Sequence, residues 1–195
     1  MKIHLFCFYL LLMCIISCGE RTIPASGIQA SPDSTQFFAT KSFFEEQRKY
    51  VILLQKPISV CHNINGVQDS AVLDSTRFGQ LVQQFIQKDI SNDNDKKNYR
   101  ETVFQDAGTN SYTLSYTAVT RDVPVQGVDI LLDEQTNQVK RIFIRSFTSK
   151  ADTSIQEQYN WHAFKGFQIN RFFTTPGGYK RRELTEVKWN HLSSE

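Results

Sequence analysis

The sequence predicts an α+β domain in which two N-terminal helices pack on a curved, mostly antiparallel meander sheet. Two segments within residues 33–90 repeat apolar residues at helical spacing. The chain after residue 98 instead consists of short alternating runs separated by turn residues. Helices that precede a run of strands are typical of α+β domains, where the helices gather on one face of the sheet.

The first helix is expected from about residue 33, because Asp33 or Ser34 supplies an N-cap side chain and Pro57 ends the segment. Its apolar side chains spread over two neighbouring faces, which indicates a helix largely covered by other elements. The two faces hold Phe37, Thr40, Phe44 and Val51, and Phe43, Tyr50 and Leu54.

A β-hairpin and a second helix are expected next. The strands fall at about 58–64 and 67–72, because Asn65-Gly66 favours a two-residue turn with positive φ. Asp74 or Ser75 then caps a helix with one apolar stripe and a glutamine-rich opposite face. The stripe consists of Phe78, Leu81, Val82, Phe85 and Ile86.

About six further strands are expected, and several carry apolar residues on both faces. The second apolar face needs curvature, a cavity or a partner to cover it. A strongly bent sheet could close on itself, or the face could form a groove for an apolar ligand such as an acyl chain. In residues 139–148 one face holds Ile142 and Ile144, and the other holds Val139, Phe143 and Phe147. The segments are "SYTLSYTAVT", "VPVQGVDILLD", "VKRIFIRSFT", "TSIQEQYNWHAF", "GFQINRFFTT" and "ELTEVKWN".

At the start of the chain, Lys2 is followed by a run of almost entirely apolar residues from Ile3 to Ile16. Its length suits a signal-peptide core of roughly 7–15 residues and is below the ~20 residues that span a bilayer. The run leads into "IISC", which resembles the lipobox of bacterial lipoproteins, with the small residue Ser17 before Cys18. The alternatives are an ordinary secretory signal with a chance cysteine and an uncleaved anchor.

The lipobox resemblance implies cleavage between Ser17 and Cys18 and makes residues 1–17 a lipoprotein signal peptide. It also implies that Cys18 carries diacylglycerol on its thiol and an N-acyl chain such as palmitate. Residues 18–32 are then a lipidated cysteine with a flexible tether, and residues 33–192 are a single α+β domain.

The residues after Cys18 bear on localisation. Gly19, rather than Asp, leaves the outer membrane as the default, and Glu20 followed by Arg21 does not form the acidic cluster associated with surface display. The predicted location is the bacterial cell envelope, lipid-anchored in the outer membrane and facing the periplasm.

Cys61 is the cysteine that remains once Cys7 and Cys14 leave with the signal peptide and Cys18 is lipidated. An intramolecular disulfide is therefore not expected. Cys61 is expected to be a buried, small apolar residue. His62 is poorly placed to activate its thiol, because adjacent strand residues point to opposite faces.

The sequence contains no recognisable catalytic or metal-binding motif. His62, His162 and His191 share no metal-ligand spacing, and "TPGGYK" lacks the strand-to-helix context of a phosphate loop. Residues 89–100 match a calcium loop at Asp89, Ser91, Asp93 and Asp95, but Asn94 replaces its glycine and Arg100 its final glutamate. We therefore expect no enzyme activity, no metal and no cofactor beyond the acyl groups on Cys18.

Two blocks resemble small lipoproteins of the Bacteroidetes kind. They are "FFEEQRKYVILLQKPISVCHNINGVQDSAVLD" with "FIQKDISN", and "FKGFQINRFF" with "LTEVKWN". The resemblance implies a membrane-anchored α+β protein and assigns no functional residue. The layout is also similar to lipoprotein-carrier folds, whose half-barrel shelters acyl chains.

The expected function is a non-enzymatic binding or scaffold domain held at the membrane. The alternatives are a lipid or lipoprotein-handling module with an apolar groove, and a hydrolase with His62 or His162 beside a carboxylate and a nucleophile. The expected partners are the membrane, through the anchor, and an envelope protein or lipid. The net charge of +2 does not suggest nucleic-acid binding. The basic stretch "GGYKRRE", with Arg171, suits either anionic headgroups or a solvated edge strand.

Overall fold

The computed structural model describes residues 37–150 and 152–189. The predicted leader and tether, Asp33, Ser34 and His191 lie outside the described residues. The helices are α2 (Thr40–Leu53), α3 (Ser75–Ile86) and the short α4 (Asp93–Lys96). The strands are β1 (Ile58–Ile64), β2 (Val67–Leu73), β3 (Tyr99–Asp106), β4 (Ser111–Ala118), β5 (Val125–Asp133), β6 (Val139–Lys150), β7 (Thr153–His162), β8 (Gly166–Thr174) and β9 (Lys180–Lys188).

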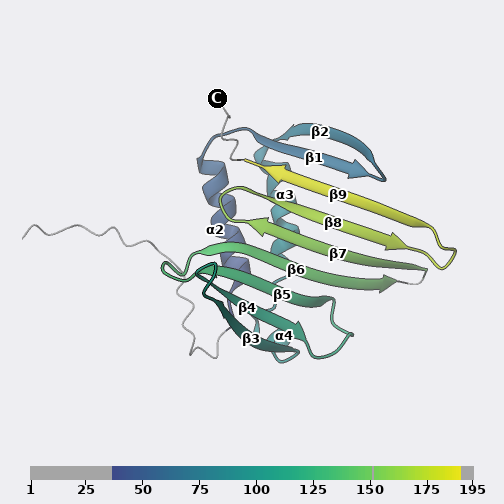
Figure 1. The fold of residues 1–195 in the computed structure, drawn as a ribbon. Helices are drawn as coiled ribbons and strands as arrows, with labels where there is room; N and C mark the ends of the chain where they lie inside the picture. Colours follow the sequence, from purple (N-terminus) through teal and green to yellow (C-terminus); the bar gives the residue numbers. More distant parts are fainter. Residues whose placement is uncertain (1–36, 151, 190–195) are drawn as a thin grey trace, which may run out of the picture.

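These nine strands form one antiparallel sheet in the order β2-β1-β9-β8-β7-β6-β5-β4-β3 (Figure 1). The hairpin β1–β2 precedes the other strands in the chain, yet β1 pairs with the last strand, β9. Strands β2 and β3 form the two edges and do not pair with each other. In the described residues the sheet therefore stays open, and the predicted closure of a strongly bent sheet on itself does not occur.

The predicted α+β class is wrong, because the sheet dominates the described chain. Helices α2 and α3 have 14 and 12 residues, and α4 has 4. The prediction did not include β3. Most side chains of its sequence "YRETVFQD" are exposed, and apolar and polar residues alternate only weakly along it. It also treated the β1–β2 hairpin as separate from the meander. The fold is a single nine-stranded antiparallel sheet with a few short helices.

Helix α2 begins at Thr40, later than the cap predicted at Asp33 or Ser34. The N-cap residue, Ala39, has no capping side chain. Instead the Asp89 carboxylate, beyond the end of α3, accepts hydrogen bonds from Thr40 Oγ1 at 2.7 Å and Lys41 N at 3.2 Å. The side chain that caps α2 therefore comes from a residue distant in the sequence, which no local pattern identifies.

The hairpin and the start of α3 follow local rules, and both predictions are confirmed. Asn65 and Gly66 have φ angles of 50° and 94°, which the two-residue turn requires. The strands span 58–64 and 67–73. The Asp74 carboxylate accepts from Arg77 N at 2.8 Å and caps α3.

An aromatic core lies between the helices and the sheet. Helices α2 and α3 lie on the same side of the sheet, behind it in Figure 1. The Trp161 ring centroid lies 5.0 Å from those of Phe85 and Phe167 and 5.2 Å from that of Phe44. Trp189 lies 5.4 Å from Trp161, and all five side chains are buried. Aromatic rings therefore fill the space under the helices.

Candidate functional site

Strand register divides the sheet into a helix-covered face and an open face. A continuous row of paired residues crosses eight strands on the helix-covered face. The row consists of Val60, Val187, Phe167, Trp161, Ile142, Ile130, Leu114 and Val103. Because side chains alternate along a strand, the flanking residues point to the opposite side. We call that side the open face, since no described helix covers it.

Uncharged amide side chains occupy the middle of the open face, on β7 and β8. We call this group the amide cluster. Gln158 lies opposite Asn170 and Asn160 opposite Gln168, and all four side chains are half-buried. Asn160 Oδ1 accepts from Arg141 Nε at 2.6 Å, and Gln168 Nε2 donates to Glu186 Oε1 at 2.8 Å. The neighbouring strands therefore hold the cluster on both sides.

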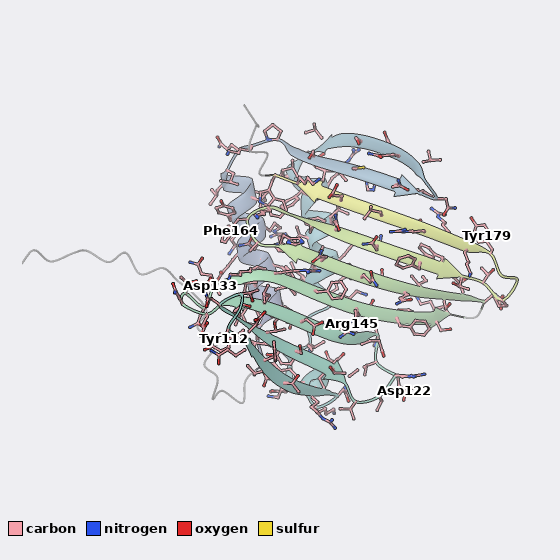
Figure 2. All side chains as sticks on the ribbon, viewed as in Figure 1. Tyr112, Asp122, Asp133, Arg145, Phe164 and Tyr179 are labelled. Carbon is pink, nitrogen blue, oxygen red and sulfur yellow. The ribbon has the colours of Figure 1, made fainter. Side chains whose placement is uncertain are left out.

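Two cationic side chains beside the amide cluster, Arg145 and Lys188, have acidic partners. Arg145, labelled near the middle of the open face in Figure 2, lies 3.5 Å from the Asp129 carboxylate. Gly127 makes this position possible, because a Cβ there would overlap the Arg145 guanidinium. Lys188 Nζ lies 2.9 Å from Glu186 Oε2. These two ion pairs therefore add little net charge to the centre of the open face.

Guanidinium groups lie over two phenylalanine rings beside the amide cluster. Arg141 lies 5.5 Å from the Phe143 ring centroid, and Arg182 lies 5.5 Å from that of Phe172. Both distances are within the range of cation–π contacts. Of the apolar residues that the sequence placed on the second face of β6, Phe143 is therefore partly covered by Arg141. Phe147 is exposed, and Val139 packs against the core instead.

The two described histidines lie on opposite faces and have neutral hydrogen-bonding partners. His62 Nδ1 lies 3.1 Å from Thr185 Oγ1, and Asn160 Nδ2 donates to His162 Nε2 at 3.1 Å. Burial, with the positive charge of Arg141, lowers the pKa of His162. Cys61 has a free thiol on the open face and is half-buried rather than buried as predicted.

The segment that partly matches a calcium loop has a structural role. Asn92 caps α4, which contains Asp93 and Asp95. Asp89 instead bonds to Thr40, Lys41 and Ser91. Among residues 37–150 and 152–189, no group of three or more His, Cys, Asp or Glu side chains is placed to hold a metal ion.

A charged network that the sequence did not suggest joins α3 to the sheet on the helix-covered face. Glu157 Oε2 accepts from Lys88 Nζ at 2.8 Å and Ser146 Oγ at 2.9 Å. Its Oε1 accepts from Tyr159 OH and Arg171 Nε, both at 2.9 Å. Burial opposes ionisation of this carboxyl, but the bonds from Lys88 and Arg171 outweigh it and lower the pKa of Glu157 to about 2. Glu157 is therefore a fixed anion whose oxygens are fully engaged.

The basic stretch near the C-terminus forms the outer end of the β8–β9 hairpin. Tyr179 is labelled at the hairpin tip in Figure 2, and Gly178 supplies the positive φ of the turn. Arg171 does not join this stretch, because it bonds to Glu157 and Gln84 on the helix-covered face. Arg181 pairs with Glu183. The hairpin turn is thus confirmed, and its basic character rests on fewer residues than the sequence suggested.

No helix in the described ranges is both long and apolar enough to cross a bilayer. Comparison of the chain with protein-family models, with curated proteins and with solved structures gave no match.

Proposed function

We propose that the protein is a lipid-anchored lipoprotein of the bacterial cell envelope whose folded domain binds a ligand without catalysis. The anchor rests on the lipobox-like sequence that ends at Cys18, behind a short apolar run. The binding surface is the open face, because the helix-covered face is filled by buried aromatic side chains. The amide cluster is the single observation that carries this assignment.

The chemistry of the amide cluster favours a neutral ligand rich in hydroxyl groups, such as a glycan chain. Each Asn or Gln side chain offers both donors and an acceptor, which is what hydroxyl groups need. Arg145 and Lys188 beside the cluster already have acidic partners, so an anionic ligand gains little from these two side chains. The open face extends across nine adjacent strands, which suits an extended chain.

The surroundings of the described histidines and of Glu157 favour binding rather than hydrolysis. The hydrolase alternative requires His62 or His162 beside a carboxylate and a nucleophile. The hydrogen-bonding partners of these rings are Thr185 and Asn160. The most perturbed described carboxyl, Glu157, has a pKa of about 2, too low for a general base near neutral pH.

Replacement of Cys18 by serine tests the anchor. The expected result is loss of the diacylglycerol and N-acyl mass and release of the protein from the membrane fraction, because serine offers no thiol for acylation. Intact-mass spectrometry of detergent-extracted protein and membrane fractionation measure the two effects. The Cys61→Ser variant is the control and should keep both the acyl mass and the membrane association. An unmodified Cys18 in the wild-type protein would contradict the anchor.

The double variant Gln158→Ala/Asn170→Ala tests the binding face. We expect the variant to bind neutral oligosaccharides about thirtyfold more weakly, because each of the two lost hydrogen bonds contributes roughly 1 kcal/mol. Isothermal titration calorimetry with maltohexaose and chitohexaose measures the change, with an oligogalacturonate as the acidic comparison. The control is Gln80→Ala/Gln83→Ala, which removes two exposed glutamine amides from α3. Failure of the wild type to bind either neutral probe would refute the glycan assignment and leave the anchor result intact.

A further inference from the structure

Strand β3 is an exposed sheet edge with large apolar side chains. Val103 is 50% exposed and Phe104 is 67% exposed, and they lie on opposite faces of the strand. In the described part of the chain β3 pairs with β4 alone. Edge strands usually avoid such residues, because free backbone groups beside apolar side chains invite pairing with another strand.

The outward backbone groups of β3 follow from its pairing with β4. Val119 N donates to Asn98 O at 2.8 Å, next to the first residue of β3. Inward and outward backbone groups alternate along an antiparallel strand. The N–H and C=O groups of Tyr99, Glu101, Val103 and Gln105 therefore face the free edge, where a further strand would meet them.

We propose that the β3 edge pairs with β3 of a second copy, antiparallel and with Val103 on the two-fold axis. This register places Arg100 opposite Asp106 of the second copy. It also places Thr102 opposite Phe104, and Glu101 opposite Gln105. The sheet then continues from one copy into the next through an isologous contact.

The register is favoured by charge on the open face. Arg100 and Asp106 both point to that face, at opposite ends of the strand, so the pairing creates two opposite-charge contacts, one on each side of the axis. The Asp106 carboxylate is fixed by Gly108 N at 2.9 Å and Thr109 Oγ1 at 2.8 Å, and these bonds lower its pKa. It is therefore ionised and already oriented at neutral pH.

Apolar contacts fill the middle of the same register. The two Phe104 rings are diagonal neighbours across the axis on the open face, within reach for aromatic side chains. The two Val103 side chains meet on the other face. An apolar centre flanked by opposite charges is the usual arrangement of a protein interface.

The other edge lacks this self-complementarity. Strand β2 has the sequence "VQDSAVL", in which Asp69 is the single charged residue. Antiparallel pairing of two β2 strands would bring no opposite charges together. The difference in charge between the two edge strands therefore favours β3 over β2 as the contact.

Cysteine cross-linking of the full-length chain tests the contact and its register. In a Cys61→Ser background, Val103→Cys should form a disulfide dimer under diamide, because the opposed Cα atoms of a hydrogen-bonded pair lie about 5.5 Å apart. Gln105→Cys is the matched control on the same face of the same strand. It lies four residues, or about 13 Å, from its own counterpart and should not cross-link. Equal cross-linking of the two variants, or of neither, would overturn the proposal.

Charge reversal provides an independent measurement of the dimer. Arg100→Glu places a glutamate opposite Asp106 and should weaken the dimer at least tenfold in sedimentation velocity of the full-length chain in detergent. Lys180→Glu reverses an exposed charge on β9, far from β3 in the strand order, and should leave the dissociation constant unchanged. A wild-type protein that remains monomeric at all concentrations, or an Arg100→Glu variant that associates like the wild type, would contradict the β3 contact.

Discussion

The Trp161→Ala variant is expected to lose about 3–5 kcal/mol of its free energy of unfolding, the usual cost of truncating a large buried aromatic side chain. Trp161 is fully buried and contacts the rings of Phe44, Phe85 and Phe167, which come from both helices and the neighbouring strand. Its removal leaves a cavity where α2, α3 and the sheet meet. Urea denaturation followed by circular dichroism measures the loss.

Two comparison variants separate this cavity from a general aromatic effect. Trp161→Phe should cost less than the alanine variant, because it keeps a ring and removes an Nε1 that has no hydrogen-bonding partner among the described residues. Phe147 is 45% exposed, so Phe147→Ala should change the stability by no more than about 0.5 kcal/mol. Equal losses in Trp161→Ala and Phe147→Ala would show that the aromatic core does not hold the helices on the sheet.

The Glu157→Gln variant is expected to lose about 2–3 kcal/mol, because the positive charges of Lys88 and Arg171 would remain in place without their common anion. The side chains of the three residues are only 14–21% exposed, so water screens this charge poorly. The matched control is Glu186→Gln. Glu186 pairs with the half-exposed Lys188 and should contribute no more than about 1 kcal/mol.

The same carboxyl predicts a pH dependence. The pKa of Glu157 is about 2 in the folded protein, below its ordinary value of 4.5. A carboxyl with a lowered pKa stabilises the folded state above its unfolded pKa, and the contribution is lost as the pH falls from about 4.5 towards 2. The wild-type protein should therefore lose more stability over this interval than Glu157→Gln. Parallel stability curves for the two proteins between pH 5 and 2.5 would refute the role of Glu157.

Local sequence signals predicted the elements whose formation depends on neighbouring residues. The Asn65-Gly66 turn and the Asp74 cap require only groups within a few positions, and both are present. The apolar stripe of α3 is also confirmed, with Phe78, Val82 and Phe85 buried. The start of α2 was misplaced, because its cap comes from Asp89, which no local pattern links to Thr40.

The features that the sequence did not predict depend on pairing between strands that are distant in the chain. The predicted fold class failed because the place of β1 beside β9 and the existence of β3 depend on strand partners rather than on local composition. The amide cluster was missed for a related reason. Gln158 and Asn170 are ordinary polar residues in their own strands, and they become neighbours only through the register of β7 and β8.

The pairing of β1 with β9 has a consequence for how the chain folds during synthesis. Ser59 lies beside Lys188, so the strand that starts the sheet acquires its inner neighbour only after the last strand has emerged. Contacts this distant in the sequence slow folding, because loop-closure entropy is lost before the pairing forms. Until then, the exposed β1–β2 hairpin and the unpaired side of β8 are free to join other chains. We therefore expect that protection of the growing chain from other chains matters most until the final residues of β9 have emerged.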